Sequence, residues 1–163
     1  EIAGIYESGK IKAPVHLRDG NEDKLVEIFK NLNISKEDYV FSTWASHLHA
    51  LLKGIPKEQV KKDILEGRSI TLHYAEHNFY SSAIVGGISP IVYSISKNLP
   101  ITFIVEDNGK SVGTPTEDCW GEISTETIVK IYQDLSLNSK ADVLYYKYEM
   151  SYPHSGTGVF VEF

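Results

Sequence analysis

Six histidines carry much of the chemistry that this sequence could perform. His47-x-His49 and His73-x₃-His77 have spacings found in metal sites, the second being i, i+4 on a helix. A zinc site normally needs a third ligand and ordered neighbours, so hydrogen-bonded histidines are the simpler interpretation of both pairs. His16 differs because it lies in an apolar, proline-stiffened loop. A histidine in such a loop is suited to shuttle protons beside a cleft.

Oxygen-rich side chains follow the long apolar segment 99–105. The segment Glu106-Asp107-Asn108-Gly109 comes directly after this predicted strand. Asn-Gly favours a simple turn, but carboxylate, amide and backbone oxygens are also the ligands that Mg²⁺ prefers. Since ligands of open α/β sheets bind outside the carboxyl ends of the strands, both interpretations stay open.

Hydrophobic periodicity predicts the elements that position these residues. Helices are expected over 1–8, 21–32, 45–52 and 57–66, from Ile88, and from Ser124 or Thr125 onward. Strands are expected over 39–41, where the strand should be buried, and over 99–105 and 141–148. Helices between apolar strands indicate an α/β fold, a three-layer, doubly wound and mostly parallel sheet, in a single domain over 1–163.

Composition excludes several classes of protein. The 163 residues carry a net charge of −6 and only two arginines, which argues against a nucleic-acid surface. The sequence contains no run of ~20 apolar residues that could cross a membrane. Cys119 is the single cysteine, so we expect no internal disulfide and a reducing, cytoplasmic location.

In chain order, several segments resemble the α subunit of the thiamine-diphosphate-dependent 2-oxoacid dehydrogenases, the E1 component, and its transketolase-like relatives. Each segment is weakly specific alone, whereas the ordered set is fairly specific and runs along most of the chain. The matching segments are 5–11, His16-Leu17 with Gly20-Asn21-Glu22, 38–43 leading to 47–49, 83–87, 99–109 and Thr114-Pro115. The resemblance implies the diphosphate-binding type of thiamine-diphosphate fold.

The resemblance also implies catalytic roles for three histidines. His16 would correspond to the histidine beside the reacting thiazolium, which donates and accepts protons. His47 matches a second active-site histidine, and His49 follows it in the same motif. The implied reaction is attack of the thiazolium ylid on the carbonyl of a 2-oxoacid or ketose-like donor, with cleavage of the adjacent C–C bond.

Cofactor and partner contacts follow from the same resemblance. Backbone groups of Ile84, Val85 and Gly86 would touch the aminopyrimidine ring of thiamine diphosphate. The Asn108 side-chain oxygen and the Lys110 backbone carbonyl would be ligands of Mg²⁺. A pyrimidine-binding, β-type subunit or domain would supply the activating glutamate in a hetero-oligomer, and a lipoyl domain could accept the product.

Two departures from the family pattern stand out. The family arginine that holds the diphosphate falls on Ala45, and the Gly-Asp-Gly motif, whose aspartate is the principal Mg²⁺ ligand, is absent from the sequence. Too few residues separate the helix that starts at Ile88 from the strand that begins near Lys97 to hold the missing strand and helix. Either the protein is a degenerate relative, or a stretch is missing between Ser96 and Lys97. We favour the second, which predicts that the Cα atoms of these two residues are not the usual ~3.8 Å apart.

Three functions therefore remain open. The leading hypothesis is an enzyme subunit that uses thiamine diphosphate and Mg²⁺. The second is a non-catalytic scaffold or regulatory relative that has lost the metal-diphosphate site, as the departures suggest. The third is a small zinc hydrolase built on the histidine pairs.

Overall fold

The structure, a computed structural model, describes residues 1–81 and 88–162. It shows a mixed α/β protein with small sheets that contain parallel strand pairs, which confirms the predicted α/β class. Contacts divide the chain into unit 1, Glu1–Ile84 with Met150–Phe163, and unit 2, Val85–Glu149. The single domain expected over 1–163 stays a prediction, because this division does not decide whether the two units fold together.

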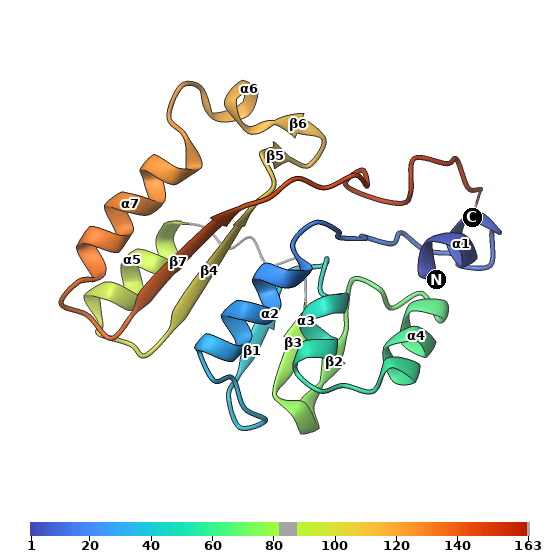
Figure 1. The fold of residues 1–163 in the computed structure, drawn as a ribbon, viewed down its shortest axis with the longest axis horizontal. Coiled ribbons are helices and arrows are strands. Elements are labelled where there is room, and N and C mark those ends of the chain that lie inside the picture. The colour runs from blue at the N-terminus through green and yellow to red at the C-terminus, as the bar shows by residue number, and fades with distance from the viewer. Residues whose placement is uncertain (82–87, 163) are drawn as a thin grey trace. The chain divides into compact units, whose positions relative to one another are not determined.

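Unit 1 contains four helices and a small mixed sheet within its described residues (Figure 1). The helices are α1 (Ile2–Glu7), α2 (Glu22–Asn31), α3 (His47–Leu52) and α4 (Lys57–Leu65). The strands are β1 (Val40–Ser42), β2 (His73–Tyr74) and β3 (Phe79–Ser81), with the 3₁₀ turn η1 (Ala75–His77) between β2 and β3. β3 pairs in parallel with β1 and antiparallel with β2. All four helices match the predicted ranges to within about two residues.

The core of unit 1 is built from apolar side chains of its helices, strands and connecting segments. Its buried members are Tyr6, Ile11, Val15, Leu17, Ala50, Ile55, Val60, Ile64, Leu72, Tyr74 and Phe79. The strand predicted over 39–41 is present, but its expected burial is wrong, since Tyr39 and Phe41 are each 66% exposed. β1 is an edge strand, and of its residues only Ser42 is buried.

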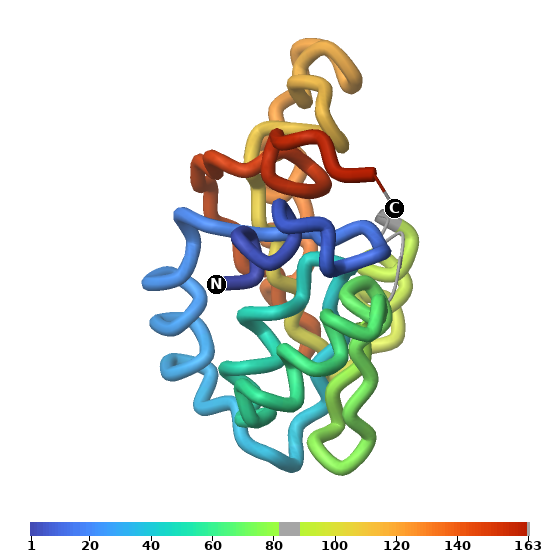
Figure 2. Tube along the Cα trace, turned by 90° about the vertical axis from the view of Figure 1, so that its right-hand side faces the viewer, coloured from blue at the N-terminus to red at the C-terminus, as the bar shows by residue number. Residues whose placement is uncertain are grey.

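The C-terminal segment of unit 1 lies along the N-terminal segment (Figure 2). The Gly156 N–H donates a hydrogen bond of 2.7 Å to the Val15 carbonyl, and Ser151 donates to the Asp19 carboxylate. Gly156 has a φ of +73°, and an added Cβ would lie 3.1 Å from the Tyr6 ring. A glycine is therefore required where the two segments meet.

Unit 2 is built around a parallel pair of strands, β4 (Thr102–Asp107) and β7 (Asp142–Lys147). α7 (Thr125–Ser136) packs along β7 and also contacts α5 (Ile88–Ser96). Ser124 caps α7, its hydroxyl accepting the Thr127 N–H at 3.1 Å, as the sequence predicted. A hairpin of β5 (Lys110–Ser111) and β6 (Thr114–Pro115) follows β4 and leads into α6 (Thr116–Trp120).

The expected break between Ser96 and Lys97 is wrong. The Lys97 N–H donates to the Tyr93 carbonyl at 2.9 Å. This is the i to i−4 hydrogen bond expected of the residue that directly follows Ser96 in helix α5. Asn98, with a φ of +53°, and Leu99 then donate to carbonyls of the last helical turn. This is a Schellman motif, which forms only on a continuous chain. Within the described stretch 88–107, α5 thus leads directly into β4 with no strand–helix pair between them.

None of the helices within residues 1–81 and 88–162 combines the length and the hydrophobicity that a membrane-spanning helix requires.

Candidate functional site

A cavity of about 380 Å³ lies in unit 1 and brings together two of the three histidines that the sequence singled out. His16, from the loop before α2, and His47, the first residue of α3, both line this cavity. Arg18, Ala45 and Tyr152 also line it. The cavity is therefore bounded by segments that lie far apart in the sequence.

His16 lies in a cluster of three rings. Its imidazole stacks on the indole of Trp44, with centroids 5.2 Å apart and planes 9° apart. The ring of His154 meets His16 edge-on, at 4.8 Å and 80°. His16 is only 7% exposed, and its Nδ1 has no hydrogen-bond partner among the described residues. Such packing fixes the ring plane while leaving one nitrogen unused.

Burial determines the charge state of His16. Its pKa is lowered from 6.5 to about 4, mainly by desolvation and to a smaller extent by the electrostatic influence of His154 and Arg18. At pH 7 the imidazole is therefore neutral, so that it can accept a proton. The proton-transfer role of His16 stays a prediction.

His47 is held by a hydrogen bond at one nitrogen. Its Nε2 lies 2.8 Å from the Ser69 hydroxyl oxygen. Its pKa is lowered to about 4, mainly by burial and slightly by His16, although a hydrogen bond with the Ser69 backbone acts in the opposite direction. The cavity thus presents two neutral imidazoles at pH 7.

His49 lies on the same helix but does not line the cavity. Its Nδ1 is 3.3 Å from the Ser42 hydroxyl, and its ring lies 6.3 Å from that of Phe29 on α2. His49 therefore joins α3 to β1 and α2, and its catalytic role stays a prediction.

The two histidine pairs do not form metal sites in the structure. His73 lies on β2 and its Nε2 is 2.7 Å from the Ser81 carbonyl oxygen, whereas His77 ends η1. The helical spacing inferred for this pair therefore does not apply. Within residues 1–81 and 88–162, no three His, Cys, Asp or Glu side chains are grouped so that they could hold a metal ion. The zinc hydrolase hypothesis has no support in this geometry.

The predicted Mg²⁺ ligands lie in unit 2, in the turn after β4. The Asn108 Oδ1 accepts the Lys110 N–H at 3.1 Å, and the Asp107 Oδ1 accepts the Gly109 N–H at 2.8 Å. The other Asp107 oxygen accepts the Tyr145 hydroxyl at 2.8 Å. Burial and this carboxylate raise the pKa of Tyr145. Asp107 and Asn108 therefore form two consecutive Asx turns, which confirms the turn that the Asn-Gly pair predicted.

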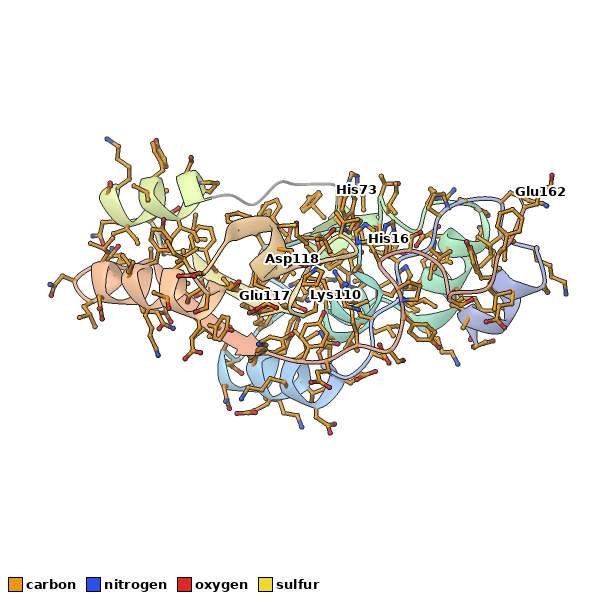
Figure 3. All side chains as sticks on the ribbon, turned by 90° about the horizontal axis from the view of Figure 1, so that it is seen from above. His16, His73, Lys110, Glu117, Asp118 and Glu162 are labelled. Atoms are coloured by element: carbon orange, nitrogen blue, oxygen red, sulfur yellow. The ribbon has the colours of Figure 1, made fainter. Side chains whose placement is uncertain are left out.

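The Lys110 carbonyl takes no part in the pairing of β5 with β6. Lys110 pairs with Pro115, which has no N–H, and the Thr116 N–H donates to the Gly109 carbonyl at 3.0 Å. Hydrogen-bonded pairs alternate along an antiparallel ladder, so the Lys110 carbonyl faces away from β6. Glu117 and Asp118 lie in the first turn of α6, which contacts β5, the strand that contains Lys110 (Figure 3).

The Asn108 amide oxygen and the Lys110 carbonyl oxygen are of the chemical type that Mg²⁺ binds, but neither carries a negative charge. An amide and a backbone carbonyl are suitable ligands, yet Mg²⁺ sites in proteins usually include one or two carboxylates. Asp107, the nearest carboxylate in sequence, already accepts two hydrogen bonds. The remaining predicted contacts, Ile84, Val85 and Gly86, lie outside the described residues.

Sequence reasoning missed one residue that lines the cavity and two that contact His16. Trp44 and His154 complete the ring cluster around His16, and Arg18 lines the same cavity. Trp44 drew no attention in the sequence, because it only precedes Ala45, the residue at the position of the family arginine. No periodicity or motif marks His154, which reaches the cluster through the C-terminal segment of unit 1.

Comparisons with known proteins confirm the resemblance to the E1 alpha family. The chain is 36% identical over 86 residues to the pyruvate dehydrogenase E1 component subunit alpha of Porphyra purpurea. It is 31% identical over 99 residues to subunit alpha-3, chloroplastic, of Oryza sativa subsp. japonica. These matches cover 47% and 55% of this chain but only 24% and 23% of the relatives. The chain thus spans about a quarter of the length of both relatives. No family model matches the chain.

Proposed function

We propose that this chain is an E1 alpha-like subunit of a thiamine-diphosphate-dependent enzyme that acts on a 2-oxoacid or ketose-like donor. The observation that carries the proposal is the placement of His16 and His47 on one cavity, both neutral at pH 7. The matches to subunits named as pyruvate dehydrogenase E1 alpha support it. They favour oxidative decarboxylation among the reactions that this chemistry allows.

The cavity fits such a cofactor in its chemistry. When bound, thiamine diphosphate supplies a carbon nucleophile that also stores the electron pair of the cleaved bond. His16, oriented by Trp44 and His154, would accept and return a proton at the nitrogen that has no partner. His47, held by Ser69, would offer its other nitrogen to the substrate. The two neutral imidazoles would therefore suit the cofactor by transferring protons beside it.

We infer a weaker role for the metal. Asn108 and Lys110 would hold Mg²⁺ through one amide and one carbonyl oxygen, with no carboxylate of the described turn free to join them. Two neutral ligands provide no negative charge to offset a divalent ion. We therefore derive no catalytic step through the metal, and its binding stays a proposal.

The finer architecture and the partners also belong to this proposal. A three-layer, doubly wound sheet, a β-type partner that supplies the activating glutamate in a hetero-oligomer, a lipoyl-domain acceptor and a cytoplasmic location all remain predictions. The parallel pairs β1–β3 and β4–β7 support the sheet. The E1 alpha resemblance supports the partners.

Calorimetry with thiamine diphosphate and Mg²⁺ tests the cofactor. We expect saturable heat with the full chain, measured alone and with a β-type partner subunit. Thiamine without its diphosphate is the matched control ligand. No heat at millimolar cofactor in either case would refute cofactor binding and favour the scaffold alternative, which Ala45 and the missing Gly-Asp-Gly motif suggest.

Replacing His16 separates chemistry from binding. His16→Ala should lower turnover by ~10²-fold or more in the complete complex, as expected for a lost acid–base group. Cofactor affinity should change little. His77→Ala, in the turn η1 outside the cavity, is the matched control. An unchanged rate in His16→Ala would remove His16 from the mechanism.

A further inference from the structure

Arg18 lines the unit 1 cavity without an anionic partner. Its Nη1 donates to the sulfur of Met150 at 3.3 Å, and a thioether is a weak acceptor. Among the described residues no carboxylate lies within 4 Å of its guanidinium, although Arg68 pairs with both Asp63 and Glu66. A half-buried guanidinium has five donors, and among the described residues the Met150 sulfur is the one side-chain acceptor found for Arg18.

The other charged side chains around the cavity do not supply this partner. Lys57 and Lys61 are both paired with Glu1, at 3.3 and 2.6 Å. Glu22 also lines the cavity, but no ion pair joins it to Arg18. Three cations and two carboxylates thus surround the space, and the excess positive charge lies at Arg18. A cavity with this charge favours an anion.

A second observation points to a ligand at the same place. His16 is 93% buried, lines the cavity, and its Nδ1 has no partner among the described residues. Buried polar atoms in proteins nearly always have a hydrogen-bond partner. The unpartnered nitrogen and the guanidinium without an anionic partner belong to residues two positions apart, and both residues line the cavity.

We propose that Arg18 is the charged anchor of an oxyanion subsite in this cavity, which His16 also lines. The guanidinium fork matches the two oxygens of a phosphate or a carboxylate. The inference deepens the proposed function, on which it rests, because both the cofactor and a 2-oxoacid donor carry such groups. Ala45, which stands at the position of the family arginine, also lines this cavity and carries no charge. Arg18 would supply a cation to the same cavity.

The experiment is calorimetry of the full chain with two probes, inorganic pyrophosphate and pyruvate, which separate a phosphate from a carboxylate as the bound group. We expect one of them to bind, and Arg18→Gln to weaken it by roughly 10- to 100-fold, the effect of one lost charge-assisted hydrogen bond. Arg18→Lys should lose less. Lys130→Gln, which removes an exposed cation of α7, should change nothing.

A measurement on the unmodified chain protects the test against a variant that fails to fold. Phenylglyoxal modifies arginine side chains, and the chain has only Arg18 and Arg68. The bound probe should slow modification of Arg18 and leave that of Arg68 unchanged, as read by mass spectrometry.

The outcomes are distinct from those of the proposed function. Binding of neither probe, equal weakening in Lys130→Gln, or no protection of Arg18 would overturn the subsite. If Arg18→Gln weakens the binding of neither probe while thiamine diphosphate still binds, the subsite fails and the proposed function stands. If a probe binds through Arg18 but thiamine diphosphate does not bind, the cofactor proposal fails alone.

Discussion

Replacing His16 with glutamine should make the stability of the protein less sensitive to acid. His16 is 7% exposed and its pKa lies near 4 in the folded chain, against an ordinary value of 6.5. Between these two values the unfolded chain binds a proton that the folded chain does not. Falling pH therefore favours unfolding over this window, and the stability is fully present only above about pH 6.5.

The magnitude follows from the two pKa values. A histidine with these values loses roughly 2 kcal/mol of folding free energy between pH 7 and pH 5, and roughly 3 kcal/mol when the pH has fallen below 4. His47 has the same lowered pKa and should contribute a similar loss. Glutamine cannot titrate, so His16→Gln should remove about half of the loss that these two histidines cause.

Urea unfolding at pH 7 and pH 5, followed by circular dichroism, measures the effect. The quantity to compare is the change in the free energy of unfolding between the two pH values, because His16→Gln also alters packing against Trp44 at both. His77→Gln is the control, since His77 ends the turn η1 and is not buried. If His16→Gln loses as much stability on acidification as the natural chain, His16 is not buried in its neutral form, and the inferred proton acceptor is refuted.

Two further substitutions test packing in unit 1, each by urea unfolding at pH 7. Gly156→Ala should cost about 1–3 kcal/mol because its Cβ would meet the Tyr6 ring at a positive φ, whereas Gly158→Ala, with open space around it, should lose only the backbone contribution; equal losses would contradict the clash. Tyr74→Phe should cost about 1–2 kcal/mol, since its buried hydroxyl donates to the Asp63 carboxylate at 2.7 Å. A loss below about 0.5 kcal/mol would show that this bond contributes little.

Local patterns predicted the helices well. The apolar stripe of α2 and the N-cap at Ser124 depend only on residues close together in the sequence. Periodicity and capping rules therefore suffice to place both helices. The burial of β1 was wrong because it depends on a neighbour. β1 pairs with β3 along one of its edges. The side chain of Phe41 stacks on Tyr80 of β3 and stays exposed.

The candidate site was predicted only where a motif exists. Family order indicated His16 and His47, and the structure places both on one cavity. The ring cluster with Trp44 and His154 depends on tertiary contacts between three distant segments, which no spacing rule reports. Arg18 was likewise invisible, because an unpaired cation is recognised only when its surroundings are known.

The exposure of β4 and the absence of the Gly-Asp-Gly aspartate have a common cause. The apolar run that becomes β4 predicted a strand covered on both faces, yet none of its residues is buried. Parallel strands normally lie inside larger sheets, and β4 pairs with β7 alone among the described residues. Because α5 leads directly into β4, the stretch 88–107 has no room for the strand–helix pair that, in the family pattern, would cover β4 and carry the aspartate of the Gly-Asp-Gly motif.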